Sequence, residues 1–377
     1  TAQGNGGTGE DFYYTPPTGF VALNTDNLSD PAIADPTKHF NTVLWSGDSS
    51  YPRSITGTGF ATDLLWFKTR NQTYDNIVLD SVRGLGSGND KAIVTNLTSA
   101  EGIDSGNFNV SSFDSGGFTM ASPSSTDTQN ASGDTYVGWN WKAGGTAVSN
   151  TDGTITSSVS ANTTAGFSIV SYTGSGSAAT IGHGLSSAPE LIIVKARNTA
   201  GYDWLVYSDP VGNTKNLRLN LANGEQTNSV FWNDTSPTAS VFSVGTGGDV
   251  NIAATTFIAY CFHSVEGYSK VGSSYTGNGS ADGTFIYTGM KPAFLLVKNI
   301  PTAARQWFIF DSARDTYNTV VKKLYSNLNN AETDADAYDF VSNGFKVRST
   351  DANWNTSGES YLYLAFAESP FKTSNAR

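Results

Sequence analysis

The feature that most constrains the fold of this 377-residue chain is a repeat, because two sequence anchors recur three times in the same order. One anchor is a short apolar run that ends in a lysine, and the other is an aromatic residue followed by Ser-Gly or Thr-Gly upstream of it. The lysines are Lys68, Lys195 and Lys298, and the aromatic residues are Trp45, Tyr172 and Tyr275. Successive copies of both anchors are separated by 127 and then by 103 positions, so the block between the anchors is kept without insertion. The chain therefore reads as three diverged copies of one unit of about 100 residues, a length that can bury a modest core.

The apolar run before each lysine predicts a strand covered on both faces, because it is continuous and bounded by turn residues. A second, alternating strand closes each unit. One of its faces carries large apolar side chains, which are Val137, Trp139 and Trp141, Ile258, Tyr260 and Phe262, and Leu362, Leu364 and Phe366. We assign that face to the core. The opposite face carries small or polar side chains such as Gly138, Asn140 and Cys261. Either another element packs closely there, or the strand is central in a two-layer sandwich.

Shorter signals agree with β-structure in each unit. Segments 113–118 and 340–345 share a Phe-to-Gly-Phe spacing that predicts a tight hairpin, which the second unit replaces with a region around Phe242. We therefore expect an all-β fold of three tandem β-sandwich repeats that resemble jelly rolls. The expected boundaries are 1–40 for an arm from a preceding domain, 41–147, 148–268 and 269–369 for the three repeats, and 370–377 for a tail.

A second set of motifs distinguishes the copies. Asn-Leu-x-x-x-Glu begins at Asn96, Asn220 and Asn327, and it predicts a strand end entering a turn, where the glutamate would cap loop amides. Asp-Ser-x-Arg occurs at 80–83 and 311–314, whereas the second unit has lost this pattern. We interpret what survives in all three copies as a requirement of the fold, and what varies as loop and rim, where binding would lie.

Composition excludes several classes of partner. The net charge is −11 and the isoelectric point is near 4.7, which disfavours nucleic acid and anionic membranes because both attract a surplus of Lys and Arg. No run approaches the roughly 18 apolar residues of a membrane span. With Cys261 as the single cysteine, no disulfide can form within the chain, so stability must come from packing or oligomerisation.

Three segments lie outside the repeated blocks. The sequence starts at Thr1 with a Gly-rich stretch, from which we expect a chain that begins inside a longer polypeptide. Residues 11–40 contain four prolines and predict a linker or arm docked on the first unit. The Gly-, Ser- and Thr-rich stretch 144–165 predicts a linker between the first two units, and the polar tail after Pro370 is expected to fray.

The residue types that carry chemistry are sparse. Only His39, His183 and His263 are available for a Ser-His-Asp or Cys-His site, and we interpret His183 and His263 as structural turn and strand-end residues. Cys261 and His263 supply too few ligands for zinc, and no segment has the register of a calcium loop or a phosphate-binding loop. The acidic run 332–336 is interpreted as a solvated loop and not as a pair of glycosidase carboxylates. The three repeated lysines are expected to reach solvent. We therefore predict no enzyme, with no catalytic, cofactor or metal residues, no cofactor, and no assigned ligand-binding residues.

The junction sequences resemble a known family. Residues 12–25 (FYYTPPTGFVALNT) and 132–145 (SGDTYVGWNWKAGG) resemble junctions in structural proteins of marine tailed bacteriophages, and residues 41–84 fit the same pattern. The resemblance spans roughly residues 10–270, with the third unit a further variant. It implies a SPRY-like (concanavalin-like) β-sandwich before Thr1, with residues 1–10 as its last loop. It also implies a tail fibre or another virion protein, and it transfers no catalytic residues.

These observations lead to one favoured hypothesis and two alternatives. The favoured hypothesis is a structural protein of the virion surface, a tail fibre or similar appendage that mediates host adhesion through multivalent contacts. Its partners would be other copies of the chain, with a trimer favoured, other virion proteins, and a host-surface glycan or protein. The first alternative is a capsid decoration protein or head fibre. The second is a secreted bacterial protein that binds or hydrolyses carbohydrate.

Overall fold

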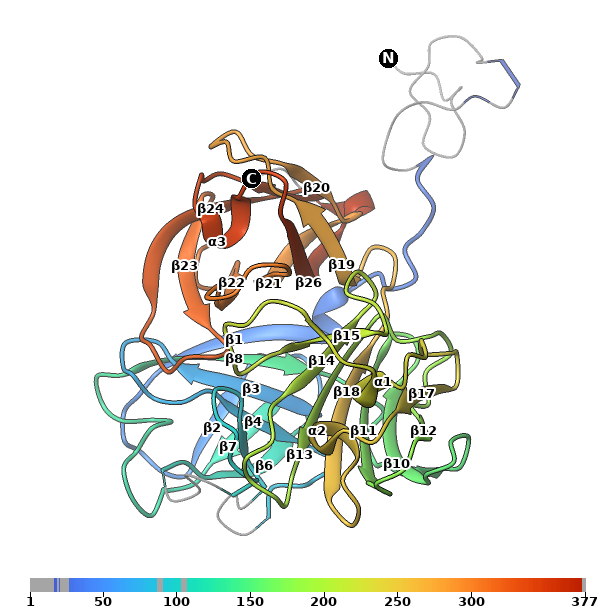
Figure 1. Ribbon diagram of the computed structural model, residues 1–377. Coiled ribbons are helices and arrows are strands. Elements are labelled where there is room, and N and C mark those ends of the chain that lie inside the picture. Colours follow the sequence, from blue (N-terminus) through green and yellow to red (C-terminus); the bar gives the residue numbers. More distant parts are fainter. Residues whose placement is uncertain (1–16, 19, 21–26, 87–90, 103–106, 375–377) are drawn as a thin grey trace.

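The computed structural model describes residues 17–18, 20, 27–86, 91–102 and 107–374, and it is almost entirely β-structure (Figure 1). The expected all-β fold of three tandem β-sandwich units is confirmed. The helices are single turns: α1 (Ser229–Trp232), α2 (Gly248–Asn251), α3 (Ala352–Asn355), and the 3-10 turns η2 (Pro36–Lys38) and η3 (Phe371–Thr373). Among the described residues, no helix combines the length and apolar character needed to cross a membrane.

The first unit consists of a main sheet and a smaller outer sheet. The main sheet has the order β1-β8-β3-β4-β5, with β1 (Phe40–Ser46), β8 (Thr135–Trp141), β3 (Leu64–Thr69), β4 (Ile77–Asp80) and β5 (Ile93–Val94). The outer sheet has the order β2-β7-β6, with β2 (Arg53–Thr56), β7 (Gly117–Met120) and β6 (Val110–Asp114). β6 and β7 form the predicted hairpin, in which Asp114 pairs with Gly117.

The second unit repeats this plan. Its main sheet has the order β16-β15-β14-β13-β18-β11-β10-β9, with β16 (Gln226–Thr227), β15 (Lys215–Arg218), β14 (Leu205–Ser208), β13 (Leu191–Ala196), β18 (Thr256–Phe262), β11 (Phe167–Thr173), β10 (Ser157–Asn162) and β9 (Val148–Asn150). Its outer sheet pairs β12 (Ala179–Gly182) with β17 (Val241–Val244), the region around Phe242.

The third unit joins both sheets into one continuous series, because β23 pairs with strands of each. The order is β19-β26-β21-β22-β23-β24-β25-β20, with β19 (Ser269–Thr276), β26 (Ser360–Pro370), β21 (Met290–Asn299), β22 (Trp307–Asp311), β23 (Val320–Tyr325), β24 (Thr333–Val341), β25 (Gly344–Val347) and β20 (Phe285–Tyr287). β24 and β25 form the second predicted hairpin, in which Val341 pairs with Gly344.

The closing strand of each unit is central in its main sheet. β8, β18 and β26 each lie between the strand that carries the aromatic anchor, which is β1, β11 or β19, and the lysine strand, which is β3, β13 or β21. The register is the same in the three units, because Leu64 pairs with Trp141, Leu191 with Phe262, and Phe294 with Phe366. Corresponding residues in the three units can therefore be identified from the strand pairing alone.

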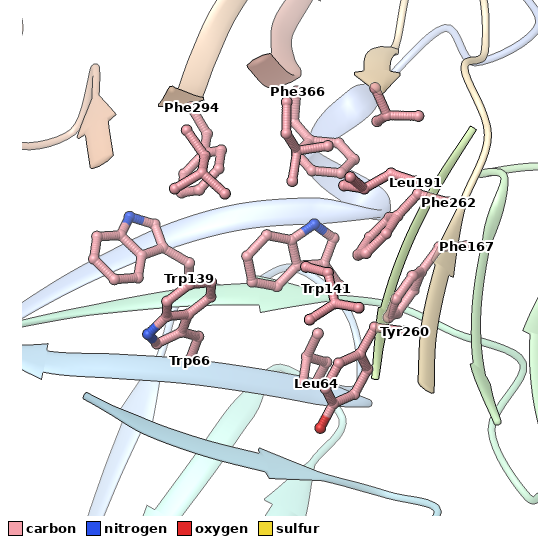
Figure 2. Close-up of a cluster of buried hydrophobic side chains, with 14 of the residues drawn as sticks. Leu64, Trp66, Trp139, Trp141, Phe167, Leu191, Tyr260, Phe262, Phe294 and Phe366 are labelled. Carbon is pink, nitrogen blue, oxygen red and sulfur yellow. The ribbon is translucent and has the colours of Figure 1, made fainter. Parts of the chain in front are cut away.

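The two faces of each closing strand belong to different cores. The large apolar face contributes to one shared core that draws on all three units, whereas the other face packs into a private core within its own unit. Figure 2 shows side chains of the three units converging on this shared core: Leu64, Trp66, Trp139, Trp141, Phe167, Leu191, Tyr260, Phe262, Phe294 and Phe366. At its centre a cavity of about 30 Å³ is lined by residues of all three units. The main sheets are thus buried on both faces, which explains their continuous apolar runs.

Two expectations about the connecting segments are wrong. The stretch 144–165 does not serve only as a linker, because β9 and β10 lie within it and extend the main sheet of the second unit. β10 pairs with β9 on one side and β11 on the other, and it buries Ser157, Val159 and Ser160. The N-terminal arm does not dock on the first unit alone. Ile33 is buried in the shared core, and η2 packs against both β1 and β26 of the third unit.

Candidate functional site

The asparagine of the Asn-Leu-x-x-x-Glu motif makes the same contacts in every unit, immediately after the strand that the sequence predicted. Its side-chain oxygen accepts a hydrogen bond from a backbone N–H at the start of the strand that follows the lysine strand, and its amide donates to the side chain of the residue before that backbone donor. The backbone donors and their acceptors are Asn76 to Asn96 (3.0 Å), Trp204 to Asn220 (2.9 Å) and Trp307 to Asn327 (3.0 Å). The side-chain acceptors are Asp75, Asp203 and Gln306. The asparagine therefore ties the end of its own strand to the start of the strand paired with it.

The three units are joined head to tail into a closed ring. Position 76 and its counterparts each donate a side-chain N–H to a backbone carbonyl of a neighbouring unit. These bonds run from Asn76 to Leu328 (2.9 Å), from Trp204 to Val94 (3.0 Å) and from Trp307 to Arg218 (2.8 Å). The first unit thus bonds to the third, the second to the first, and the third to the second. We call the three contacts the 1–2, 2–3 and 3–1 junctions.

The glutamate of the same motif also crosses each junction, and it does not cap loop amides as expected. Its backbone N–H donates to a carbonyl of the adjoining unit, in the pairs Glu101 to Arg197 (2.7 Å), Glu225 to Ile300 (2.7 Å) and Glu332 to Arg70 (2.6 Å). The side chains of Glu101 and Glu332 form ion pairs with the same Arg197 and Arg70, at 2.9 and 2.8 Å. Burial alone would raise the pKa of Glu332, but hydrogen bonds and charge from its arginine partners hold it below the ordinary value.

The Asp-Ser-x-Arg motifs form buried ion pairs at two of the junctions. Arg83 Nε contacts Asp80 Oδ2 at 2.5 Å, and Arg314 Nε contacts Asp311 Oδ2 at 2.6 Å, with all four side chains fully buried. Each aspartate also accepts a hydrogen bond from the neighbouring unit. The donors are Tyr260 Oη to Asp80 at 2.8 Å and Trp139 Nε1 to Asp311 at 3.0 Å. The carboxylates of Asp80 and Asp311 are therefore fully engaged in hydrogen bonds and ion pairs at the junctions, and burial shields them from any substrate.

The 2–3 junction has lost every part of this arrangement. The strand register places Ser208 where the other units have the aspartate, and Val211 where they have the arginine. On the facing unit, Leu364 replaces the donor residue and Ile300 replaces the arginine partner of the glutamate. Val211, Leu364 and Ile300 are all buried in the shared core. The 2–3 junction is thus an apolar version of the other two, which explains the missing motif in the second unit.

The repeated lysines do not reach solvent, which overturns the expectation from sequence. Lys68, Lys195 and Lys298 are fully buried. Each ammonium group donates to a carbonyl in the following turn, at Gln72, Tyr202 or Arg305. Lys195 and Lys298 also lie 3.4 Å from carbonyls of the adjoining unit, Thr98 and Ala222. Burial lowers the pKa of Lys68 and Lys298 to about 7 and that of Lys195 to about 8.

The candidate catalytic residues are placed in structural roles. Leu185 donates its backbone N–H to Nδ1 of buried His183, whose Nε2 lies 3.0 Å from the carbonyl of Thr238. Burial lowers the pKa of His183 and raises that of the Cys261 thiol. Among the described residues, no group of three His, Cys, Asp or Glu side chains is arranged to hold a metal ion. The acidic run 332–336 divides, because Glu332 lies in the 3–1 junction while Asp334 is exposed and pairs loosely with Lys322 at 3.7 Å.

The outer sheets differ most at their edge strands. β2, β12 and β20 correspond, since Ile55, Ile181 and Ile286 each pair with a phenylalanine of the adjacent strand. The residues flanking this isoleucine are Ser54 and Thr56 in the first unit, Thr180 and Gly182 in the second, and Phe285 and Tyr287 in the third. Phe285 is 47% exposed and Tyr287 is 63% exposed. The third unit alone therefore displays two aromatic rings at these positions, and sequence analysis missed them.

A cleft adjoins Tyr287 where the N-terminal arm, the C-terminal turn and the third unit meet. It has a volume of about 290 Å³, and its apolar walls include Leu28, Pro31, Tyr287 and Phe371. Lys372 closes one side by pairing with Asp30 at 2.7 Å and donating to the carbonyl of Leu28 at 2.8 Å. The face of β20 together with this cleft, which we call the β20 site, is the candidate for binding, because it joins two exposed aromatic rings to a cleft.

Comparison with known proteins identifies one matching family. A family model described as a Domain of unknown function (DUF7483) matches residues 35–370, and so covers all three units as a single domain. This extent fits a ring with one shared core better than three independent modules. No curated protein and no solved structure matches the chain.

Proposed function

The chain belongs to the family of the Domain of unknown function (DUF7483), and we propose that it is a non-catalytic module of the bacteriophage virion surface, in a tail fibre or similar appendage, that adheres to the host. The virion assignment rests on the resemblance of residues 12–25 and 132–145 to phage structural proteins. The adhesive role rests on the structure of the described residues.

The adhesive role is supported by the location of the polar side chains that recur in the three units. The repeated Asp, Arg, Glu and Lys side chains are buried at the junctions, where they bond to neighbouring units. None of them lines the cleft beside Tyr287. The repeated charged side chains thus hold the units together. The surfaces that differ between units remain exposed and can contact a ligand. This division is typical of a scaffold that presents a binding surface.

Adhesion by such a module depends on copy number. One chain presents a single β20 site, because the first two units lack its aromatic residues. Association of several chains on one appendage, with a trimer favoured, would display several sites together. Sites that are weak individually then gain avidity if their spacing lets them engage at once.

The test is the position of the chain in an intact particle. Particles of the phage that encodes the chain would be imaged by cryo-electron microscopy, with an antibody fragment raised against the purified chain as a marker. Density or label at the tail supports the proposal. Label on the head lattice would establish a decoration protein or head fibre instead. Absence from the particle, together with secretion from bacteria, would establish the secreted carbohydrate-binding alternative.

A further inference from the structure

We propose that the β20 site binds an uncharged oligosaccharide, with the rings of Phe285 and Tyr287 as the stacking surface. This inference rests on the proposed function and names the class of ligand that the adhesive surface would take. It is carried by three observations: aromatic residues confined to one unit, charges that are paired within the chain, and a cleft that continues the aromatic face.

The two rings occupy positions where the fold does not require them. The side chains at these positions in the first unit are Ser54 and Thr56, and the sheet around them has the same strand pairing. Burial of Ile286 between them satisfies the private core of the third unit. Exposing large aromatic side chains to water brings no folding stability, so their presence at 47% and 63% exposure indicates a contact surface.

The rings are also suitably placed. Phe285 and Tyr287 alternate with buried Ile286 and therefore point to the same side of β20, about 7 Å apart along the strand. The Tyr287 hydroxyl lies 3.5 Å from where a Cβ on Gly289 would stand, so the ring leans over this glycine toward the cleft. Gly289 has a φ of +73°, a conformation that a residue with a side chain adopts only with strain.

The charges around the site favour an uncharged ligand. Lys346, beside Phe285 in the sheet register, pairs with Asp282 at 2.5 Å, and Arg348 pairs with Asp339 at 3.3 Å. Lys372 is held by Asp30 at the cleft. Each of these cations is therefore neutralised by a neighbouring carboxylate, and the chain as a whole carries a charge of −11. An acidic glycan or a nucleic acid would meet paired cations and a repulsive field.

The cleft supplies the polar groups that aromatic rings lack. Ser29 and Glu266 line it together with the apolar walls. The Ser29 hydroxyl can donate a hydrogen bond to a sugar hydroxyl or accept one from it, and the Glu266 carboxylate can accept one, while the ring faces cover the apolar sides of the sugars. Its volume of about 290 Å³ lies at the lower end of the range of small-molecule sites, which suits one end of a short oligosaccharide.

The experiment measures binding of the whole chain to a panel of immobilised oligosaccharides of two to six sugars, both uncharged and acidic. We expect at least one uncharged member to bind, and the Phe285→Ala, Tyr287→Ala double variant to bind it at least tenfold more weakly. The matched control is Ser54→Ala, Thr56→Ala, which alters the same positions of the first unit and should leave binding unchanged. Both variants change exposed side chains, so the thermal unfolding midpoint should stay within a few degrees of the parent.

Several results would overturn the inference. They are binding of acidic members only, no binding to any uncharged member, or equal binding by the double variant. Loss of self-association in sedimentation, without any effect on sugar binding, would show that the face is an interface between chains. Failure here is distinguishable from failure of the proposed function, because a chain located on the tail whose double variant still binds host cells would keep adhesion and lose only this site.

Discussion

Arg70 of the first unit and Glu332 of the third, 262 positions apart, form a two-pronged ion pair with N–O distances of 3.0 and 2.8 Å. This contact closes the ring, because the other two junctions join units that are consecutive in the chain. Glu332 also accepts from Arg314 at 2.9 Å, so one carboxylate serves an arginine on each side of the 3–1 junction.

Removing this carboxylate should weaken the ring. Glu332→Gln leaves the buried Arg314 with one partner fewer, and we expect a loss of about 3 kcal/mol in the free energy of unfolding. The matched control is Glu225→Gln in the second unit, whose partner Lys215 is half-exposed and whose facing residue is Ile300. That change should cost no more than about 1 kcal/mol. Urea unfolding measures both, and equal losses would contradict a special role for the 3–1 junction.

The apolar 2–3 junction provides a template for the 1–2 junction. Asp80→Ala alone leaves Arg83 buried without its nearest counter-ion, with only Glu101 left among the described residues, at 3.8 Å, and should cost about 3–5 kcal/mol. The triple variant Asp80→Ser, Arg83→Val, Tyr260→Leu copies three of the four residues that distinguish the 2–3 junction, and it removes both charges of the buried Asp80–Arg83 pair. We expect it to be more stable than Asp80→Ala, since an apolar replacement of a whole buried pair is often neutral. Calorimetry would decide, and a triple variant less stable than the single one would show that the three positions do not act as one unit.

The buried lysines should make stability depend on pH. Folding lowers their pKa to about 7 or 8, so between pH 7 and the ordinary lysine value the unfolded chain holds protons that the folded chain has released. The free energy of unfolding therefore rises with pH in this window, by up to about 1.4 kcal/mol per pH unit for each lysine.

Lys298→Met isolates this effect. The variant cannot titrate at this position, so its stability should rise less steeply than that of the parent between pH 7 and 8.5. Unfolding measured at three pH values in that range gives both slopes. Lys270→Met, at a half-buried position in β19, is the control and should keep the slope of the parent. Identical slopes for parent and Lys298→Met would mean that the buried ammonium keeps its proton throughout.

The shared core should make the three units unfold together. The ring of Phe294 contacts Phe366 of its own unit and three rings of the first unit, which are Phe40, Trp139 and Trp141. Phe294→Ala should cost about 3–5 kcal/mol through lost contacts and a cavity. Hydrogen exchange followed by mass spectrometry should show reduced protection in the main sheets of all three units. Reduced protection in the third unit alone would contradict a common core.

Much of the architecture could be predicted from local sequence patterns. The alternation in 136–141 placed Val137, Trp139 and Trp141 on one face, and the spacing of 113–118 located a hairpin, because both depend only on neighbouring residues. The shared spacing from aromatic turn to lysine identified the repeat for the same reason. These features follow from strand geometry and turn chemistry, which a sequence displays directly.

The tertiary structure decided which partner each face meets. The sequence marked one face of the closing strand as apolar, but it did not show that this face enters a core shared with the other two units, because such contacts join distant segments, as in the bond from Trp139 to Asp311. The same limit explains the lysines, which end a strand and whose burial is completed by a neighbouring unit at Thr98 or Ala222. It also explains Phe285 and Tyr287, which look like core residues in sequence. Only the tertiary structure, in which Ile286 turns into the core of the third unit, leaves Phe285 and Tyr287 on the opposite face of β20 and exposed to water.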